Sequence, residues 1–456
     1  MSEAIIEPTT PHHDVPAGEH ICPVCGRESA EPPVPFAALS ADMQALVATN
    51  APGGRLVSTV CARCVQLFER ALVQIKVDAV VFEQGNRVLP TPLRMDADER
   101  FTGRGVTIAF LDSGFYAHPD LTTPENRILA YHNIVPGGES TLETTDPASW
   151  HGMMTSVVAA GNGGLSKGFY RSIAPGANVV LVKVSKSGRI TERELELGLE
   201  WVMAHRVEYN IKVLNISAGG DANDSYLHNS LSQAIENAVR KGLIVVAAVG
   251  NAGMMPGHPV LPPASAPSCI AVGGLDDQNS LDRARRGMYR SSYGPTVDGL
   301  QKPEVIAPGI WVPAPILPHT PTAAEAELYA KLDRAADAEL RALIEENRET
   351  DKDLYEARDL PTHLLRHLIT IKLHEGDVIT EHYKYMDGTS FAAPIVSSII
   401  ACMLEANPQL TPQHVKRLLI DTAERLPGID IDRQGWGVVN ARRAIEAALA
   451  LRPIQA

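Results

Sequence analysis

The chain has 456 residues with a formal net charge of −13 at pH 7, and 45% of its residues are hydrophobic against 21% charged. This composition is typical of a soluble globular protein and excludes collagenous, disordered and disulfide-scaffold chains. The acidic balance and the lack of a long Lys/Arg run argue against nucleic acid as a partner.

The chain also lacks the usual membrane and export signals. No run approaches about 18 uninterrupted apolar residues, so we expect no membrane span and no membrane partner. The first residues, MSEAIIEPTTPHHDVPAGEH, have neither a basic leader nor an apolar run, unlike a secretion signal. We therefore expect a cytoplasmic protein.

Residues 1–87 hold two C-x-x-C pairs, Cys22/Cys25 and Cys61/Cys64. In a reducing compartment this pattern favours a metal site over disulfides, and four thiolates match a closed, tetrahedral structural zinc site. The interval 26–60 is longer than the commonest ribbon spacing, so redox thiols or unligated cysteines stay open as alternatives. We predict a small zinc-ribbon-like module with bound Zn²⁺.

Residues 88–104 mix prolines, charges and glycines, which predicts a linker or edge segment. From residue 105 to 456, short apolar runs alternate with amphipathic stretches, as in an α/β domain with buried parallel strands. Thr191 with Glu194 forms a capping box for one helix, and Thr411 with Pro412 opens another.

Residues 313–385 interrupt the α/β alternation. A proline-rich entry is followed by a charged stretch in which leucines recur at roughly helical spacing. We expect one or two amphipathic surface helices in this insertion.

Four polar residues lie at predicted strand or helix ends. Asp112 ends the apolar run VTIAFLD, His151 opens HGMMTS, Asn251 follows LIVVAAVG, and Ser390 lies in DGTSFAAP. Each alone is usually a turn or capping residue. Together they match nucleophilic acyl transfer: Ser390 as nucleophile, His151 as base, Asp112 to orient the imidazole and Asn251 as oxyanion donor.

With the motifs DSG, HG, NISAGG, GN, APG and GTSFAAP in this order, the stretch from Gly105 to Leu451 resembles the subtilisin-like serine peptidases, the subtilases. The resemblance implies a three-layer fold with a mostly parallel central sheet and a serine endopeptidase that forms an acyl-enzyme on protein or peptide substrates. It also implies substrate contacts in two segments, at residues Ser217, Ala218, Gly219, Ala248 and Gly250.

The sequence departs from the family pattern at several places. Met153 and Met154 stand where a Thr-His pair is usual, and Gly161–Ile173 does not match a family calcium loop, which leaves calcium binding uncertain. The insertion at 313–385 is a lid, an exosite, a dimer contact or a solvated helix pair. The stretch Val88–Arg94 is either a plain linker or a cleft-blocking segment.

Two other functions remain open. The chain can be a catalytically idle subtilase scaffold that binds a regulatory partner through the zinc module or the insertion. It can also be a peptide ligase or transferase, in which an amine rather than water resolves the acyl-enzyme. For hydrolysis, we expect turnover to rise with pH around the ordinary imidazole pKa of about 6.5.

Overall fold

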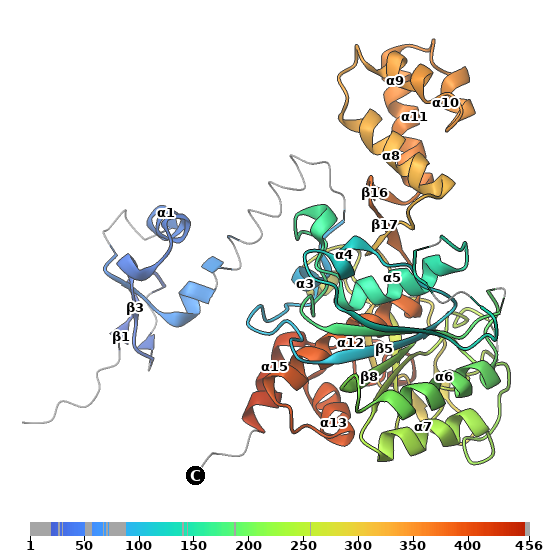
Figure 1. Ribbon diagram of the computed structural model, residues 1–456. Coiled ribbons are helices and arrows are strands. Elements are labelled where there is room, and N and C mark those ends of the chain that lie inside the picture. Colours follow the sequence, from blue (N-terminus) through green and yellow to red (C-terminus); the bar gives the residue numbers. More distant parts are fainter. Residues whose placement is uncertain are drawn as a thin grey trace, which may run out of the picture. The chain divides into compact units, whose positions relative to one another are not determined.

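The computed structural model describes residues 20–25, 28–29, 31–50, 57–66, 68–69, 72, 88–138, 141–143, 145–186, 188–255 and 257–451. The chain divides into two compact units, Met1–Asn86 and Arg87–Ala456 (Figure 1).

The described residues of unit 1 form short elements around a small core. Strand β1 (His20–Ile21) pairs antiparallel with β2 (Glu28–Ser29), and β3 (Val34–Pro35) pairs antiparallel with β4 (Thr59–Val60). Helix α1 (Ala41–Asn50) follows a 3-10 turn at Phe36–Ala38. The apolar side chains of Met43, Val47 and Val60 pack with three of the four cysteines, which gives the unit a core of its own.

Unit 2 is built on a central sheet of eight strands. Their order is β11-β10-β9-β8-β5-β7-β6, with β14 pairing β10, and every pair except β10–β11 is parallel. The strands are β5 (Thr107–Asp112), β6 (Ile128–Asn133), β7 (Asn178–Lys183), β8 (Ile211–Ile216), β9 (Ile244–Ala248), β10 (Ile270–Asp276), β11 (Gly287–Met288) and β14 (Val305–Pro308). This mostly parallel sheet confirms the predicted fold class.

Helices cover both faces of this sheet (Figure 1). Strand β5 shows why, because its side chains alternate between two cores: Ile108 and Phe110 face one, and Ala109 and Leu111 face the other. The first core includes α5 (Ser149–Ala160), α12 (Thr389–Ala406), α13 (Pro412–Thr422) and α15 (Ala441–Ala450). The second includes α6 (Glu192–His205) and α7 (Ser230–Arg240). The result is a three-layer α/β fold.

The remaining elements are short. They are α3 (Thr91–Arg94), α4 (Pro119–Thr122), η3 (Gly164–Ser166), η4 (Arg283–Arg285), β12 (Gly294–Pro295), β13 (Gln301–Lys302) and α14 (Ile431–Gln434). The Thr191 and Glu194 side chains form the expected capping box at the start of α6, and Thr411 caps α13.

Among the described residues, one helix is long and apolar enough to cross a membrane by length and composition alone. It is α12, and 89% of its apolar window is buried inside the protein. Such burial is typical of the core helix of a globular domain.

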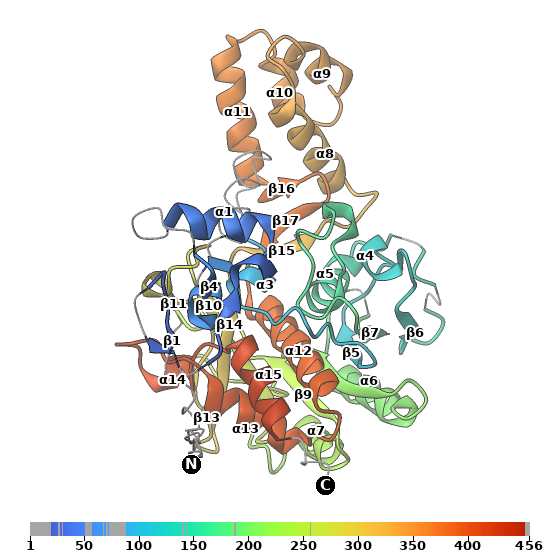
Figure 2. The same ribbon diagram turned by 90° about the vertical axis from the view of Figure 1, so that its left-hand side faces the viewer.

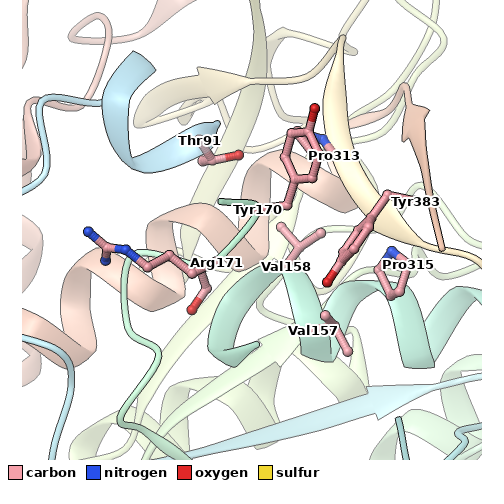
Figure 3. A pocket seen from close by; sticks show the side chains of 9 residues that line it. Thr91, Val157, Val158, Tyr170, Arg171, Pro313, Pro315 and Tyr383 are labelled. Carbon is pink, nitrogen blue, oxygen red and sulfur yellow. The ribbon is translucent and has the colours of Figure 1, made fainter. Parts of the chain in front are cut away.

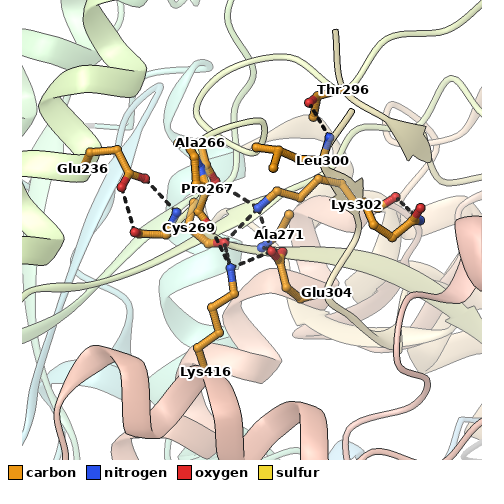
Figure 4. Close-up of polar contacts among 12 residues, drawn as sticks. Glu236, Ala266, Pro267, Cys269, Ala271, Thr296, Leu300, Lys302, Glu304 and Lys416 are labelled. Carbon is orange, nitrogen blue, oxygen red and sulfur yellow. Dashed lines mark hydrogen bonds and ion pairs between the residues drawn. The ribbon is translucent and has the colours of Figure 1, made fainter. Parts of the chain in front are cut away.

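A cluster of charged side chains connects the edge of the sheet with α13, in which Lys416 lies (Figure 4). The Lys302 ammonium donates to the carbonyls of Ala266 and Cys269 and to Glu304, at 2.7–3.0 Å. The Lys416 ammonium donates to the same Glu304 oxygen at 2.6 Å. Burial lowers the pKa of Lys302, although the Glu304 charge opposes this effect.

The insertion contains more structure than the one or two surface helices that the sequence predicts. It has four helices, α8 (Pro321–Arg334), α9 (Leu340–Glu346), α10 (Lys352–Glu356) and α11 (Thr362–Glu375), and a ribbon of β15 (Val312–Pro315), β16 (Val378–Thr380) and β17 (Tyr383–Met386). The helices bury Leu332, Leu340 and Leu365 against one another. They therefore form a small subdomain, which projects from the body of unit 2 (Figures 1 and 2).

Val88–Arg94 is a packed part of unit 2 rather than a plain linker. Arg94 is 4% exposed, and its guanidinium holds both carboxylate oxygens of Asp277 at 2.8 Å and the carbonyl of Ile310 at 2.8 Å. The Leu89 amide donates to the side chain of Asn279. None of these partners is a predicted site residue, so the contacts give no support to a cleft-blocking role.

Candidate active site

Asp112 and His151 meet at the carboxyl end of the central strand. Asp112 is the last residue of β5, and His151 lies in the first turn of α5. The His151 Nδ1 lies 2.7 Å from the Asp112 Oδ1, and the Asp112 side chain is 2% exposed. Asp112 also accepts hydrogen bonds from the Ser113 amide and from the Thr155 hydroxyl, so its carboxylate is held at both oxygens.

The glycine after His151 allows this approach. A Cβ built on Gly152 would lie 2.1 Å from the Gly114 carbonyl oxygen and 2.9 Å from the Asp112 Cβ. Helix α5 therefore starts in direct contact with the turn that follows β5, and a larger residue would push His151 away from Asp112. Met153 and Met154 are both buried in the core of unit 2.

Two opposing effects act on His151. Burial disfavours the charged imidazolium, but the charge of the Asp112 carboxylate and its hydrogen bond favour it. The two effects of Asp112 outweigh burial, so the pKa of His151 is raised above its ordinary value. The imidazole is thus a stronger base than free histidine.

Ser390 lies in the first turn of α12, which begins after Gly388 at a φ of +136°. Its hydroxyl donates to the Ser217 carbonyl at 3.2 Å, and the Ser217 hydroxyl donates in return to the Ser390 carbonyl at 2.9 Å. The His151 ring lies next to the following residue, Phe391, with ring centroids 5.9 Å apart.

The side-chain amide of Asn251 is held in place by hydrogen bonds to its oxygen. Its Oδ1 accepts from the Thr389 amide at 2.9 Å and from the Thr389 hydroxyl at 3.0 Å. This leaves the NH₂ group on the side of Gly388, where a Cβ would lie 3.6 Å from the Asn251 Nδ2. A hydrogen-bond donor therefore faces the start of α12 beside Ser390.

The two predicted substrate segments follow neighbouring strands. Ser217, Ala218 and Gly219 come after β8, and Ala248 ends β9, which pairs with β8 in parallel. Gly219 is exposed with open space around it. Because parallel strands end at one edge of a sheet, both segments lie on the side of Ser390.

Two supporting residues, Thr155 and Thr389, are not predicted from the sequence. Thr155, which binds Asp112, lies four residues after His151 on α5 and therefore on the same helix face. Thr389, which orients Asn251, is part of the GTS motif, but its contact joins segments 138 positions apart. The four-residue spacing of His151 and Thr155 is therefore a signal in the sequence, whereas the contact between Thr389 and Asn251 has none.

A small cavity lies where the insertion joins α5 (Figure 3), and none of the predicted catalytic residues lines it. Tyr170 and Tyr383 line it together with Val157, Val158 and Ser172, and its volume of about 10 Å³ is room for about one water. The Tyr383 hydroxyl also donates to the buried Asp120 carboxylate at 2.5 Å. The cavity thus marks the junction of the insertion rather than a substrate site.

The four cysteines of unit 1 come together. Their sulfurs all lie within 4.8 Å of one another, with Cys22–Cys64 and Cys25–Cys61 each at 3.9 Å. A tetrahedral zinc with bonds of about 2.3 Å sets sulfur–sulfur distances of about 3.8 Å. The donor set therefore fits a zinc ion.

The backbone favours a thiolate at Cys22. Burial raises its pKa, but hydrogen bonds from the backbone of Cys61, Cys25 and Val24 outweigh burial and lower the pKa to about 6. Burial raises the pKa of Cys64. A cation among the four sulfurs would favour the thiolate at every position.

Comparison with known proteins places the chain in a family. Residues 103–437 match the model of the subtilase family. The chain is 31% identical over 361 residues to the serine protease AprX of Bacillus subtilis (strain 168), covering 76% of this chain and 67% of that protein. It is 31% identical over 211 residues to subtilisin Savinase of Lederbergia lenta, covering 46% of this chain and 65% of that protein.

A solved structure shows the same fold. Fervidolysin from Fervidobacterium pennivorans, a keratinolytic enzyme related to subtilisin, superposes with a TM-score of 0.52 at 21% identity, over 80% of this chain and 46% of that chain. The family match and the fold agree, and the chain belongs to the subtilase family of serine-type endopeptidases.

Proposed function

We propose that the chain hydrolyses peptide bonds through Ser390, with His151 as base and Asp112 as the group that orients it. The observation that carries this proposal is the 2.7 Å contact between His151 and the buried Asp112, at the same sheet edge as the start of α12. A carboxylate on Nδ1 leaves Nε2 free to accept the serine proton.

The proposed reaction has two halves. The Ser390 hydroxyl first rotates and breaks its hydrogen bond to the Ser217 carbonyl. It then gives its proton to His151, and its oxygen attacks the substrate carbonyl carbon. The Asn251 Nδ2 and the amides at the start of α12 stabilise the resulting oxyanion. His151 then returns the proton to the leaving amine, and water attacks the acyl-enzyme in the same way to release the acid and restore Ser390.

Labelling of the full chain by a fluorophosphonate probe tests this proposal. We expect the wild type to be labelled and Ser390→Ala to remain unlabelled. The absence of Ser390-dependent labelling would contradict the proposal and favour an idle scaffold. Mass spectrometry of peptide products separates hydrolysis, which adds water, from ligation, in which an amine takes the acyl group.

We also propose that Cys22, Cys25, Cys61 and Cys64 hold a structural zinc. The sulfur–sulfur distances of 3.9 Å support this proposal. Four protein ligands leave no open position on the metal, so bound zinc would stabilise unit 1 and take no part in peptide hydrolysis. Reduced thiols suit the cytoplasm, which we propose as the location.

A further inference from the structure

Two polar side chains that the mechanism does not use form a hydrogen-bonded path to the nucleophile. Asn215 in β8 is 1% exposed, and Ser397 in α12 is 0% exposed. The Ser397 hydroxyl donates to the Asn215 Oδ1 at 3.0 Å, and the Asn215 Nδ2 donates to the Ser217 Oγ at 3.0 Å. The Ser217 hydroxyl then donates to the Ser390 carbonyl at 2.9 Å.

The donors and acceptors along this path have a fixed direction. Because the Asn215 oxygen accepts the hydrogen bond from the Ser397 hydroxyl, the Asn215 NH₂ group faces Ser217. Because the Ser217 oxygen accepts from that NH₂ group, its own proton is available for the Ser390 carbonyl. A change of the buried Asn215 amide would therefore alter the hydrogen bond at the Ser390 carbonyl, two hydrogen bonds away.

The Ser390 carbonyl needs this outside donor. In an α-helix the carbonyl of residue 390 would accept from the amide of residue 394. Residue 394 is a proline inside α12, and proline has no N–H. The Ser217 hydroxyl therefore supplies the donor that Pro394 cannot, at the backbone of the nucleophile itself.

We infer that Asn215 is a positioning residue for Ser390. It orients the Ser217 hydroxyl, which holds the Ser390 backbone and so fixes where the Ser390 hydroxyl can reach His151 and a substrate carbonyl. This inference rests on the proposed function of Ser390. It assigns to Asn215 no contact with substrate.

The first test is Asn215→Asp in the full chain. A carboxylate accepts from both Ser397 and Ser217, so Ser217 would turn its proton away from Ser390. We expect kcat for a chromogenic peptide to fall about 10- to 100-fold with KM within about twofold, because a small displacement of a reacting group costs about this much. Because kcat is calculated per active site titrated with the fluorophosphonate probe, a fall in the folded fraction alone does not lower it.

A second pair of variants needs no buried charge. Ser397→Ala removes the donor that orients Asn215. Ser398→Ala is the matched control, because Ser398 is equally buried in the same helix and its Oγ accepts instead from the Ala174 amide. We expect Ser397→Ala to lower kcat and Ser398→Ala to leave it unchanged. Should Asn215→Asp fail to fold, this pair decides.

Pro394→Ala tests the route through the carbonyl. It restores an N–H that can bind the Ser390 carbonyl within α12. We expect the loss caused by Asn215→Asp to shrink at least about fivefold in the Pro394→Ala background, as expected for coupled residues.

The outcomes separate the two proposals. Wild-type labelling that does not depend on Ser390 overturns the proposed function and this inference with it. Ser390-dependent labelling with equal kcat in wild type, Asn215→Asp and Ser397→Ala overturns the inference alone. An undiminished loss in the Pro394→Ala background also overturns it, because the Ser390 carbonyl is then not the route.

Discussion

Asn251 shows how one side chain can serve two functions at the level of single atoms. Its oxygen is held by Thr389, and its NH₂ group is the proposed oxyanion donor. Asn251→Asp keeps the acceptor and removes the donor. We expect kcat to fall about 10²- to 10³-fold, the loss found for one such donor in subtilisin, with little change in KM for a chromogenic peptide.

Thr389→Val provides the comparison for this change. It removes the hydroxyl contact with Asn251 at 3.0 Å but keeps the backbone amide that also holds the Asn251 oxygen. We expect a smaller loss than for Asn251→Asp. A small loss for Asn251→Asp, no larger than that for Thr389→Val, would mean that Asn251 acts by holding the start of α12 rather than by donating to the oxyanion.

The raised pKa of His151 predicts the pH dependence. Only neutral imidazole can accept the Ser390 proton, so kcat/KM should rise with a midpoint above the ordinary value of about 6.5. In Asp112→Asn the raising effect of the carboxylate is lost and burial remains, so the midpoint should move to lower pH. A pH–rate profile of both chains measures this shift, and an unchanged midpoint would contradict the assignment of His151.

Asp112→Asn should also lower kcat itself. The amide no longer selects the tautomer that leaves Nε2 unprotonated, and the equivalent change in a chymotrypsin-type protease costs about 10⁴-fold.

The raised pKa of His151 also affects the stability of the fold. Its contribution to stability falls as the pH rises, whereas kcat/KM rises with pH. A group whose folded pKa is raised stabilises the fold fully below its unfolded pKa of about 6.5, and the contribution disappears as the pH rises through the folded value. His151 thus favours folding at acidic pH, where it is charged and inactive as a base.

At the scale of elements, the sequence predicts what is periodic and local. The apolar runs that form β5, β8 and β9 are buried strands in the structure, and the Thr191 capping box starts α6 as expected. Long-range contacts have no such signal. Nothing around Arg94 indicates that Asp277 and the Ile310 carbonyl, more than 180 positions away, enclose its guanidinium.

The sequence predicts fewer elements in the insertion than the structure contains, for a related physical reason. Its helices are charged along their exposed faces, which suggests solvated surface helices. Their apolar faces, however, pack on one another through Leu332, Leu340 and Leu365 rather than on the sheet. The separate core follows from contacts between helices, which helical spacing in one segment does not predict.

The Arg94 contacts predict the result of shortening the chain. A chain that begins at residue 95 loses the buried Arg94 partner of Asp277 and should unfold with about 3–5 kcal/mol less free energy than a chain that begins at residue 87. Urea unfolding measures this difference, and Arg94→Met in the full chain should reproduce much of it. A stable, more active chain from residue 95 would instead support the cleft-blocking role.

At the scale of the whole molecule, the core of unit 1 and the core of unit 2 differ in what stabilises them. Unit 2 buries two large apolar clusters, one on each face of its sheet, and is the part that matches the subtilase family. Among the described residues of unit 1 the cluster of buried residues is small, and three of its members are cysteines. Folding of unit 1 should therefore depend on the metal, whereas folding of unit 2 should not.

A chelator strong enough to remove zinc should accordingly unfold unit 1 alone. We expect one zinc per chain by elemental analysis, and loss of hydrogen-exchange protection at residues 34–50 and 57–66 after chelation, while the strands of the central sheet stay protected and peptide turnover is retained. Cys22→Ser should reproduce the loss. Cys269→Ser, at a buried cysteine of unit 2, is the matched control and should keep its zinc. Zinc-free protein with a protected unit 1 would contradict the structural metal, whereas turnover lost together with zinc would show that unit 2 depends on unit 1.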